Sequence, residues 1–285
     1  MVIKNANIDL HVHPFLDRNP MKDVFDAMNR SKLDVLALEN FNESIYPHAL
    51  SEAMQLYDFR DNDHAGMSFS NNKYILNARE YDSKERMYAI TVGYSFEARQ
   101  DAELRSIIDE GLKNDAFVII DHPFVDNENT RTAGHISYQK EKFLEKICME
   151  YSGQIALEWN SYCIPWIRAG LKPVLNALGH NVEYHDVNSK AEVFSNSLYM
   201  AGYNAPIVAD TDLHGRNKRL LSKMGTSRMI MDIEGESPSD VVKSIKKNVF
   251  ERNHKNIKDK VSAAHLFEAF CLPMLFPGHF WKPRA

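Results

Sequence analysis

The chain has 285 residues, 44% hydrophobic and 26% charged, which is typical of a folded protein with a sizeable core. Its net charge of −5 gives no overall attraction to nucleic acid or anionic lipid, so neither is expected as a partner. No apolar run approaches the roughly 20 residues that cross a bilayer, and the N-terminus lacks a signal-peptide pattern. Three cysteines without CxxC spacing indicate reduced thiols, and we therefore expect a cytoplasmic protein.

Strand-like and helix-like segments alternate along the chain. Strands are predicted up to residue 13 and at 33–39, 74–80, 87–93, 116–121, 154–159, 206–211 and 226–232. Helices are predicted at 20–32, 47–59, 101–114, 139–152, 165–178 and 189–203 and from Ser237 onward, with a loop at 60–72. This order predicts parallel strands joined by right-handed crossovers, and hence an α/β sheet or barrel.

One barrel domain is expected over residues 1–255, followed by a C-terminal helical extension over 256–285. The extension carries Phe267, Phe270, Leu272 and Leu275, so a homodimer through this helix is a possible assembly.

The first strand ends in two histidines one residue apart. Because side chains at i and i+2 of a strand point the same way, Asp9, His11 and His13 are expected on one face. Two converging imidazoles supply half of the ligands of a metal site. An isolated His-x-His pair, however, more often lies on the solvent-exposed face of an edge strand.

Further polar side chains stand at the ends of other apolar runs. They are Glu80, His122, Glu158, Asn160, Asp210, Asp212 and His214. In a parallel barrel the carboxyl ends of all strands meet at one rim, where active sites lie. The barrel therefore explains how residues so distant in sequence would form one site. Asp9 and Asp210 would orient imidazoles or make capping or core hydrogen bonds.

The ordered set resembles the polymerase and histidinol phosphatase (PHP) superfamily of metal-dependent phosphoesterases. The matches are Asp9-Leu10-His11-Val12-His13 to its DxHxH, Glu80 to its strand-end glutamate, His122-Pro123 to its HP motif, Glu158-Trp159-Asn160 to a further strand end and Asp212-Leu213-His214 to its closing DxH. The resemblance implies a distorted (β/α)7, TIM-like barrel with up to three divalent metal ions (Zn, Mn or Fe). It also implies hydrolysis of a small phosphorylated metabolite or a nucleotide.

Two family histidines have no counterpart here. Glu39-Asn40-Phe41 stands where the family has Thr-Asp-His, and Met87 and Tyr88 occupy the region of a later histidine. One or two metals are therefore expected to be retained.

The resemblance distributes the metal ligands over three positions. It implies a first metal on His11, His13, Glu80 and Asp212, a second on Glu80 and His122, and a third on His214 with Asp17 or Glu39. Asp212 would orient the attacking water or accept its proton, and His214 would protonate the leaving oxygen.

Substrate binding is expected from Asn160, Arg216 and Arg219, since guanidinium groups pair with phosphate oxygens two at a time. A solvated loop is the alternative for the two arginines. A degenerate barrel acting as a non-catalytic binding or regulatory module is the main alternative to an enzyme. An amidohydrolase is disfavoured because no strand end offers its bridging lysine.

Overall fold

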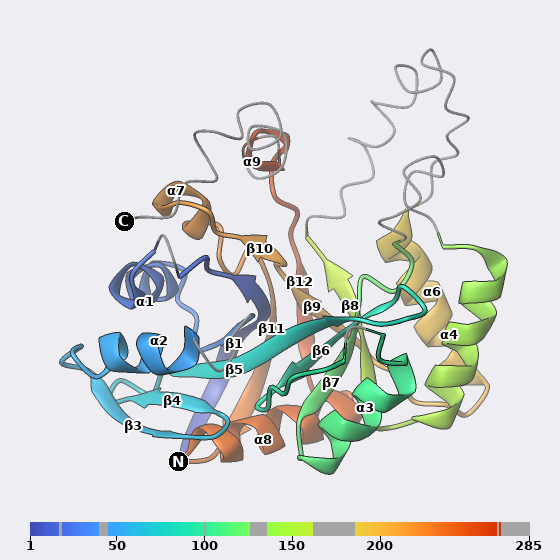
Figure 1. The fold of residues 1–285 in the computed structure, drawn as a ribbon, viewed down its shortest axis with the longest axis horizontal. Coiled ribbons are helices and arrows are strands. Elements are labelled where there is room, and N and C mark those ends of the chain that lie inside the picture. Colours follow the sequence, from blue (N-terminus) through green and yellow to red (C-terminus); the bar gives the residue numbers. More distant parts are fainter. Residues whose placement is uncertain are drawn as a thin grey trace.

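The computed structural model describes residues 1–16, 19–39, 45–99, 101–125, 136–161, 186–266 and 268. Its centre is a strongly curved sheet (Figure 1). The main path of this sheet contains, in chain order, β1 (Val2–His13), β2 (Val35–Leu38), β5 (Tyr74–Asp82), β6 (Tyr88–Val92), β7 (Phe117–Asp121), β8 (Ile155–Asn160), β9 (Ile207–Asp210), β11 (Ser227–Glu234) and β12 (Lys255–Lys258). The spatial order of the strands is β12-β11-β1-β2-β5-β6-β7-β8-β9.

Side-chain hydrogen bonds bring the two ends of this sheet together. Asn256 on β12 accepts a bond from the Ala209 amide at 3.0 Å and donates to the Ile207 carbonyl at 2.9 Å, both on β9. Asp9 on β1 accepts from the Thr211 amide just after β9, also at 3.0 Å. The sheet is therefore a nearly closed barrel, which agrees with the α/β barrel predicted from the sequence. The more detailed expectation, a barrel of seven βα units, remains a prediction.

The expectation that all strands run in one direction is wrong for two of the predicted strands. The ladders β1–β2–β5 and β7–β8–β9 are parallel, but β6 is antiparallel to both of its neighbours, and β11 is antiparallel to β1 and to β12. Because only residues 83–87 separate β5 from β6, these two strands form a hairpin, which requires antiparallel pairing. The carboxyl ends of β1, β2, β5, β7, β8 and β9 still meet at one rim.

Helices cover the outside of the barrel and one of its ends. They are α1 (Met21–Arg30), α2 (Ile45–Ala53), α3 (Leu104–Lys113), α4 (Tyr138–Glu150), α6 (Val187–Met200), α7 (Lys218–Leu221), α8 (Pro238–Phe250) and α9 (Ala263–Leu266). The interior cluster takes side chains from eight strands, among them Ile8, Tyr74 and Phe117, and also Val241 and Ile245 of α8. Helix α8 therefore closes the amino end of the barrel, and the opposite rim is left for the polar side chains (Figure 1).

The predicted start of α8 is confirmed by its capping box. The Ser237 hydroxyl accepts from the Asp240 amide, the Asp240 carboxylate accepts from the Ser237 amide, and Pro238 opens the helix.

The loop predicted at 60–72 is instead a hairpin of β3 (Phe59–Asp63) and β4 (Gly66–Phe69), with β4 pairing to β5. The polar sequence of β3 conceals the strand, because this strand is mostly exposed at the sheet edge. A two-residue strand, β10 (Leu213–His214), which was not predicted separately, pairs with the end of β1.

The sheet continues past the boundary predicted at residue 255, because β12 pairs with β11. The helix predicted at 165–178 and the apolar side chains proposed for dimerisation lie outside the described residues. In the part of the chain that the structure describes, no helix has the length and apolar character to cross a membrane.

Candidate metal centre

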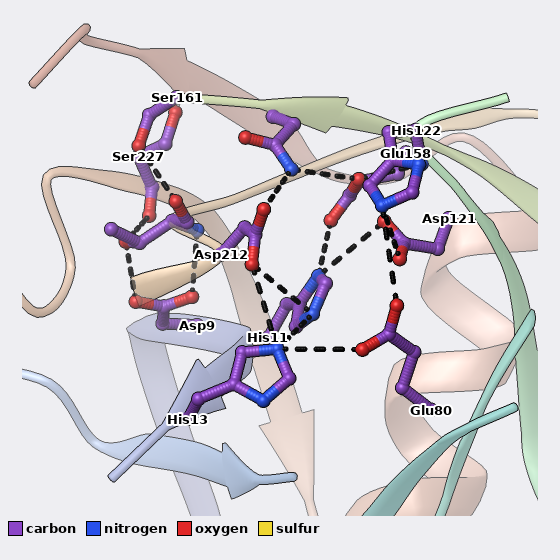
Figure 2. Close-up of polar contacts among 12 residues, drawn as sticks. Asp9, His11, His13, Glu80, Asp121, His122, Glu158, Ser161, Asp212 and Ser227 are labelled. Carbon is purple, nitrogen blue, oxygen red and sulfur yellow. Dashed lines mark hydrogen bonds and ion pairs between the residues drawn. The ribbon is translucent and has the colours of Figure 1, made fainter. Parts of the chain in front are cut away.

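Polar side chains from several strand ends converge at the open rim of the barrel, and Figure 2 shows most of them. His11 and His13 come from β1, Glu80 from β5, Asp121 and His122 from the end of β7, and Glu158 and Asn160 from β8. Glu39 follows β2, Asp210 ends β9, and Asp212 and His214 follow it. The sequence predicted this convergence from the strand ends alone.

A register shift in β1 directs both histidines into the rim. The pairing of β1 with β2 shifts between Asp9 and Val12, as at a β-bulge. Ile8 and Leu10 belong to the interior cluster, whereas Val12 packs in an outer one. The regular alternation predicted for Asp9, His11 and His13 is therefore interrupted.

Asp9 separates from the two histidines as a result. Its carboxylate accepts hydrogen bonds from the Thr211 amide and hydroxyl and from the Gly225 amide, at 2.6–3.0 Å. Of the two roles left open for Asp9, the structure shows the core hydrogen bond.

The centre of the site is a triangle of three donor atoms. His11 Nε2 lies 3.0 Å from His13 Nε2, and Asp212 Oδ1 lies 3.4 Å from the first nitrogen and 3.6 Å from the second. Ligands bonded at about 2.0–2.1 Å to a tetrahedral cation lie about 3.3–3.4 Å from one another. The three atoms therefore have the spacing that a single divalent cation requires.

Neighbouring side chains fix the orientation of this triangle. Glu158 Oε1 binds His11 Nδ1 at 2.5 Å, so the other ring nitrogen points toward His13 and Asp212. Asn160 donates to Asp212 Oδ2 at 2.7 Å, which leaves Oδ1 to the histidines. The His122 amide holds the second oxygen of Glu158 at 2.7 Å. Such supporting bonds set the direction and basicity of metal ligands.

A second group of donors lies beside the first. His122 Nε2 is 2.9 Å from Asp121 Oδ2 and 4.0 Å from Glu80 Oε1, while the other oxygen of Glu80 is 3.6 Å from His13 Nε2. Glu80 therefore spans both groups with its two oxygens. Among the described residues, three sets of donor atoms lie within 4.8 Å of one another: His11 with His13 and Asp212, His11 with Glu80 and Asp121, and His11 with Glu158 and Asp210.

Two of these residues have unusual backbone conformations. His122 has φ of 24° and Asp212 has φ of 49°, both in the region that residues with a Cβ rarely adopt. At His122 the turn brings the imidazole within 2.9 Å of the Asp121 carboxylate, although adjacent residues of a regular strand point to opposite faces. Strain of this kind is concentrated at functional sites.

Negative charge dominates the site. Six carboxylates gather there (Glu39, Glu80, Asp121, Glu158, Asp210 and Asp212), and within the described ranges their ion pairs are all with histidines. Both carboxylate oxygens of Glu39 and of Asp210 are enclosed without a hydrogen-bond donor. Buried carboxylates without donors are costly unless a cation or a proton neutralises them.

The pKa shifts have the same cause. Burial, reinforced by the charge of Glu80, raises the pKa of Glu39 well above its usual range. Burial and the charge of Glu158 do the same to the pKa of Asp121 and of Asp210. Although burial opposes it, the charges of Asp212 and Glu158 raise the pKa of His11 well above its usual range. In the metal-free protein, protons therefore supply the positive charge that the donor set requires.

The remaining predicted residues stand at the edge of this cluster. The His214 ring packs at a tilt against that of His13, with ring centroids 4.6 Å apart, and its Nδ1 lies 3.4 Å from Asp212 Oδ1. The Arg216 guanidinium lies over the Phe15 ring at 4.8 Å. Arg219 is exposed and pairs with Glu268 at 3.3 Å, so it is not brought into the cluster.

The third metal position implied by the resemblance, on His214 with Asp17 or Glu39, has no matching donor set among the described residues. Asp17 lies outside the described residues, and no donor set there includes Glu39 or His214. Asp121 is the residue that sequence reasoning missed. Its only signal was its place before His122 at the end of a strand.

No protein-family model and no curated protein sequence matches the chain. Two solved structures resemble it over most of its length. PsfC from Pseudomonas syringae PB-5123 has 13% identity and a TM-score of 0.55, over 97% of this chain and 99% of PsfC. The lesion-specific endonuclease PfuEndoQ from Pyrococcus furiosus has 14% identity and a TM-score of 0.50, over 90% of this chain and 58% of the endonuclease. At these identities the likeness concerns the fold alone.

Proposed function

We propose that this protein is a metal-dependent hydrolase, specifically a phosphoesterase acting on a small phosphorylated metabolite or a nucleotide. The observation that carries the proposal is the buried cluster of six carboxylates and four histidines in which, among the described residues, no lysine or arginine pairs with a carboxylate. A structural ion-pair network would balance its charges, whereas this one is balanced only when cations or protons enter.

The donor set fits two neighbouring divalent cations such as Zn, Mn or Fe. His11, His13 and Asp212 would hold the first, and Asp121 and His122 would hold the second, with Glu80 shared between them. When bound, such ions activate water and stabilise the charge that develops on phosphoryl oxygens.

The protein's own groups would orient and protonate the substrate. Asn160 holds Asp212 by a hydrogen bond, and Asp212 would direct the attacking water or accept its proton. His214 is the most exposed of the four histidines, with 23% of its side chain accessible against 1% for His11. It can therefore reach a substrate at the rim and donate a proton to the leaving oxygen.

Arg216 is the better candidate for holding the phosphate. It contacts Phe15, whose ring centroid lies 6.3 Å from that of His214, so the guanidinium lies near the proposed proton donor. Arg219 would have to leave Glu268 before it could bind a substrate. The description of PfuEndoQ as an endonuclease adds phosphodiesters to the candidate substrates.

The experiment is hydrolysis by purified protein reloaded with Zn, Mn or Fe after chelation. p-Nitrophenyl phosphate and bis-p-nitrophenyl phosphate distinguish a monoesterase from a diesterase. We expect metal-dependent turnover that is lost in His11→Ala and kept in the matched control His48→Ala, which changes an exposed histidine on α2. Metal binding without hydrolysis of either ester would favour a non-catalytic binding module. Failure to bind metal would contradict both the hydrolase and the metal-binding, non-catalytic module.

A further inference from the structure

We propose that the chain has a second ligand site, a cleft for a small oxyanion such as phosphate, where the barrel closes. The cleft lies between α6, the start of β9 and the segment 252–258 that contains β12. Figure 1 labels these elements. Its charged lining consists of Arg252, His254, Lys258 and Glu192. The proposal does not depend on the metal centre or on the hydrolase activity.

The size of the cleft limits the ligand to a small one. Its volume is about 210 Å³. Pockets for drug-sized ligands have about 300–1,000 Å³, whereas one water takes about 30 Å³ of liquid. The cleft is therefore large enough for an oxyanion with some of its water, and too small for a nucleotide.

Arg252 supplies a guanidinium without a counter-charge. Its Nε donates to Asn204 Oδ1 at 3.2 Å, and its Cζ lies 4.1 Å from the centre of the Tyr199 ring. No carboxylate of the described chain is within ion-pair distance of it, and its Nη2 is enclosed without a hydrogen-bond partner. Because the two contacts already fix the side chain, little conformational entropy is lost when an anion binds.

The other charged groups also favour an anion. Lys258 contributes a second positive charge and is paired with Glu192 at 2.9 Å. The cleft lining therefore carries two positively charged side chains, Arg252 and Lys258, and one carboxylate, Glu192. The chain as a whole has a net charge of −5. The local charge is opposite to that of the metal centre, so the two sites select opposite ligands.

His254 forms part of the cleft wall and offers no ring nitrogen to a ligand. Its Nε2 donates to the Ile207 carbonyl at 2.9 Å, since a carbonyl oxygen can only accept. Its Nδ1 is enclosed and does not reach the cleft surface. Recognition of the oxyanion therefore depends on Arg252 and Lys258.

The test is calorimetric titration of inorganic phosphate into the protein, metal-loaded and chelated, at constant ionic strength. We expect saturable binding that survives both chelation and His11→Ala. Arg252→Gln should weaken binding at least about tenfold, the value of one or more charge-assisted hydrogen bonds. Lys255→Gln removes an exposed charge from the same strand outside the cleft, and it should leave binding unchanged.

A second variant protects the test against a folding defect in Arg252→Gln. Glu192→Gln removes the one carboxylate of the cleft lining and frees Lys258, so phosphate should bind roughly twofold to fivefold more tightly. A gain in affinity cannot arise from misfolding. The proposal is overturned if phosphate does not bind, if Arg252→Gln binds it as well as the wild type, or if His11→Ala abolishes binding.

Discussion

Replacement of Glu39 by glutamine should show whether the buried charge of this residue serves a bound cation or only the fold. Glu39 is 2% exposed, and both of its carboxylate oxygens are enclosed without a hydrogen-bond donor. Its pKa is raised well above the usual range by burial and by the charge of Glu80. A carboxylate whose folded-state pKa is raised costs stability at neutral pH, so glutamine, which has the same shape, removes this cost.

The magnitude follows from the burial of this group. An unsatisfied buried polar group costs about 1–3 kcal/mol, and glutamine recovers part of that cost because its amide can donate to neighbouring carboxylates. We expect the chelated variant to be about 1 kcal/mol more stable than the wild type, a rise in Tm of about 2 °C for a chain of this size. A metal at 100 times its Kd stabilises the folded protein by about 2.7 kcal/mol. This stabilisation should decrease in the variant, because it lacks one of the negative charges that attract the cations to the site.

The assay is thermal unfolding of wild type and Glu39→Gln, each with a chelator and with saturating Mn or Zn. The matched control is Glu234→Gln, which changes an exposed glutamate on β11 and should change neither melting temperature. Glu39→Gln should thus be the more stable protein without metal and gain less from metal. Equal destabilisation in both conditions would refute the reasoning and make Glu39 a structural residue.

Four further outcomes are expected. His11→Ala should abolish metal-dependent turnover and metal binding while retaining the far-UV circular dichroism spectrum; unchanged turnover would exclude the mechanism. Asn160→Ala should weaken metal affinity about 10- to 100-fold in competition titrations, as the loss of a ligand-orienting hydrogen bond does elsewhere. Metal binding near pH 7 should release protons, because the raised pKa of His11 keeps its ring protonated in the metal-free protein. The affinity for metal should therefore rise with pH. Calorimetry in buffers of different ionisation enthalpy would count the protons released. Asp9→Ala should cost about 3 kcal/mol or more in denaturant unfolding, because three buried donors lose their acceptor, yet it should leave the metal stoichiometry unchanged.

The periodicity of the sequence predicted which side chains would lie close together, because the parallel strands of a barrel end at the same rim. His11, Glu80 and Asp212 each follow an apolar run, and parallel strands bring such positions to one rim. The convergence of ligand-type residues was therefore predictable without the spacing of any single motif.

The residues that sequence reasoning misplaced depend on local backbone geometry. Asp121 was missed because a regular strand directs it away from His122, and the positive φ of His122 has no sequence signal. Asp9 was grouped with the two histidines because the register shift in β1 cannot be read from alternation. The β3–β4 hairpin was missed for a tertiary reason, since its polar edge strand is defined by pairing rather than by apolar content.

The most direct test of the metal centre is anomalous diffraction from crystals of the protein grown with Mn or Zn. The account predicts an anomalous peak within bonding distance of His11 Nε2, His13 Nε2 and Asp212 Oδ1, and at full loading a second peak beside Glu80 and His122. Crystals that show no peak at this rim, from protein that binds no metal in solution, would contradict it.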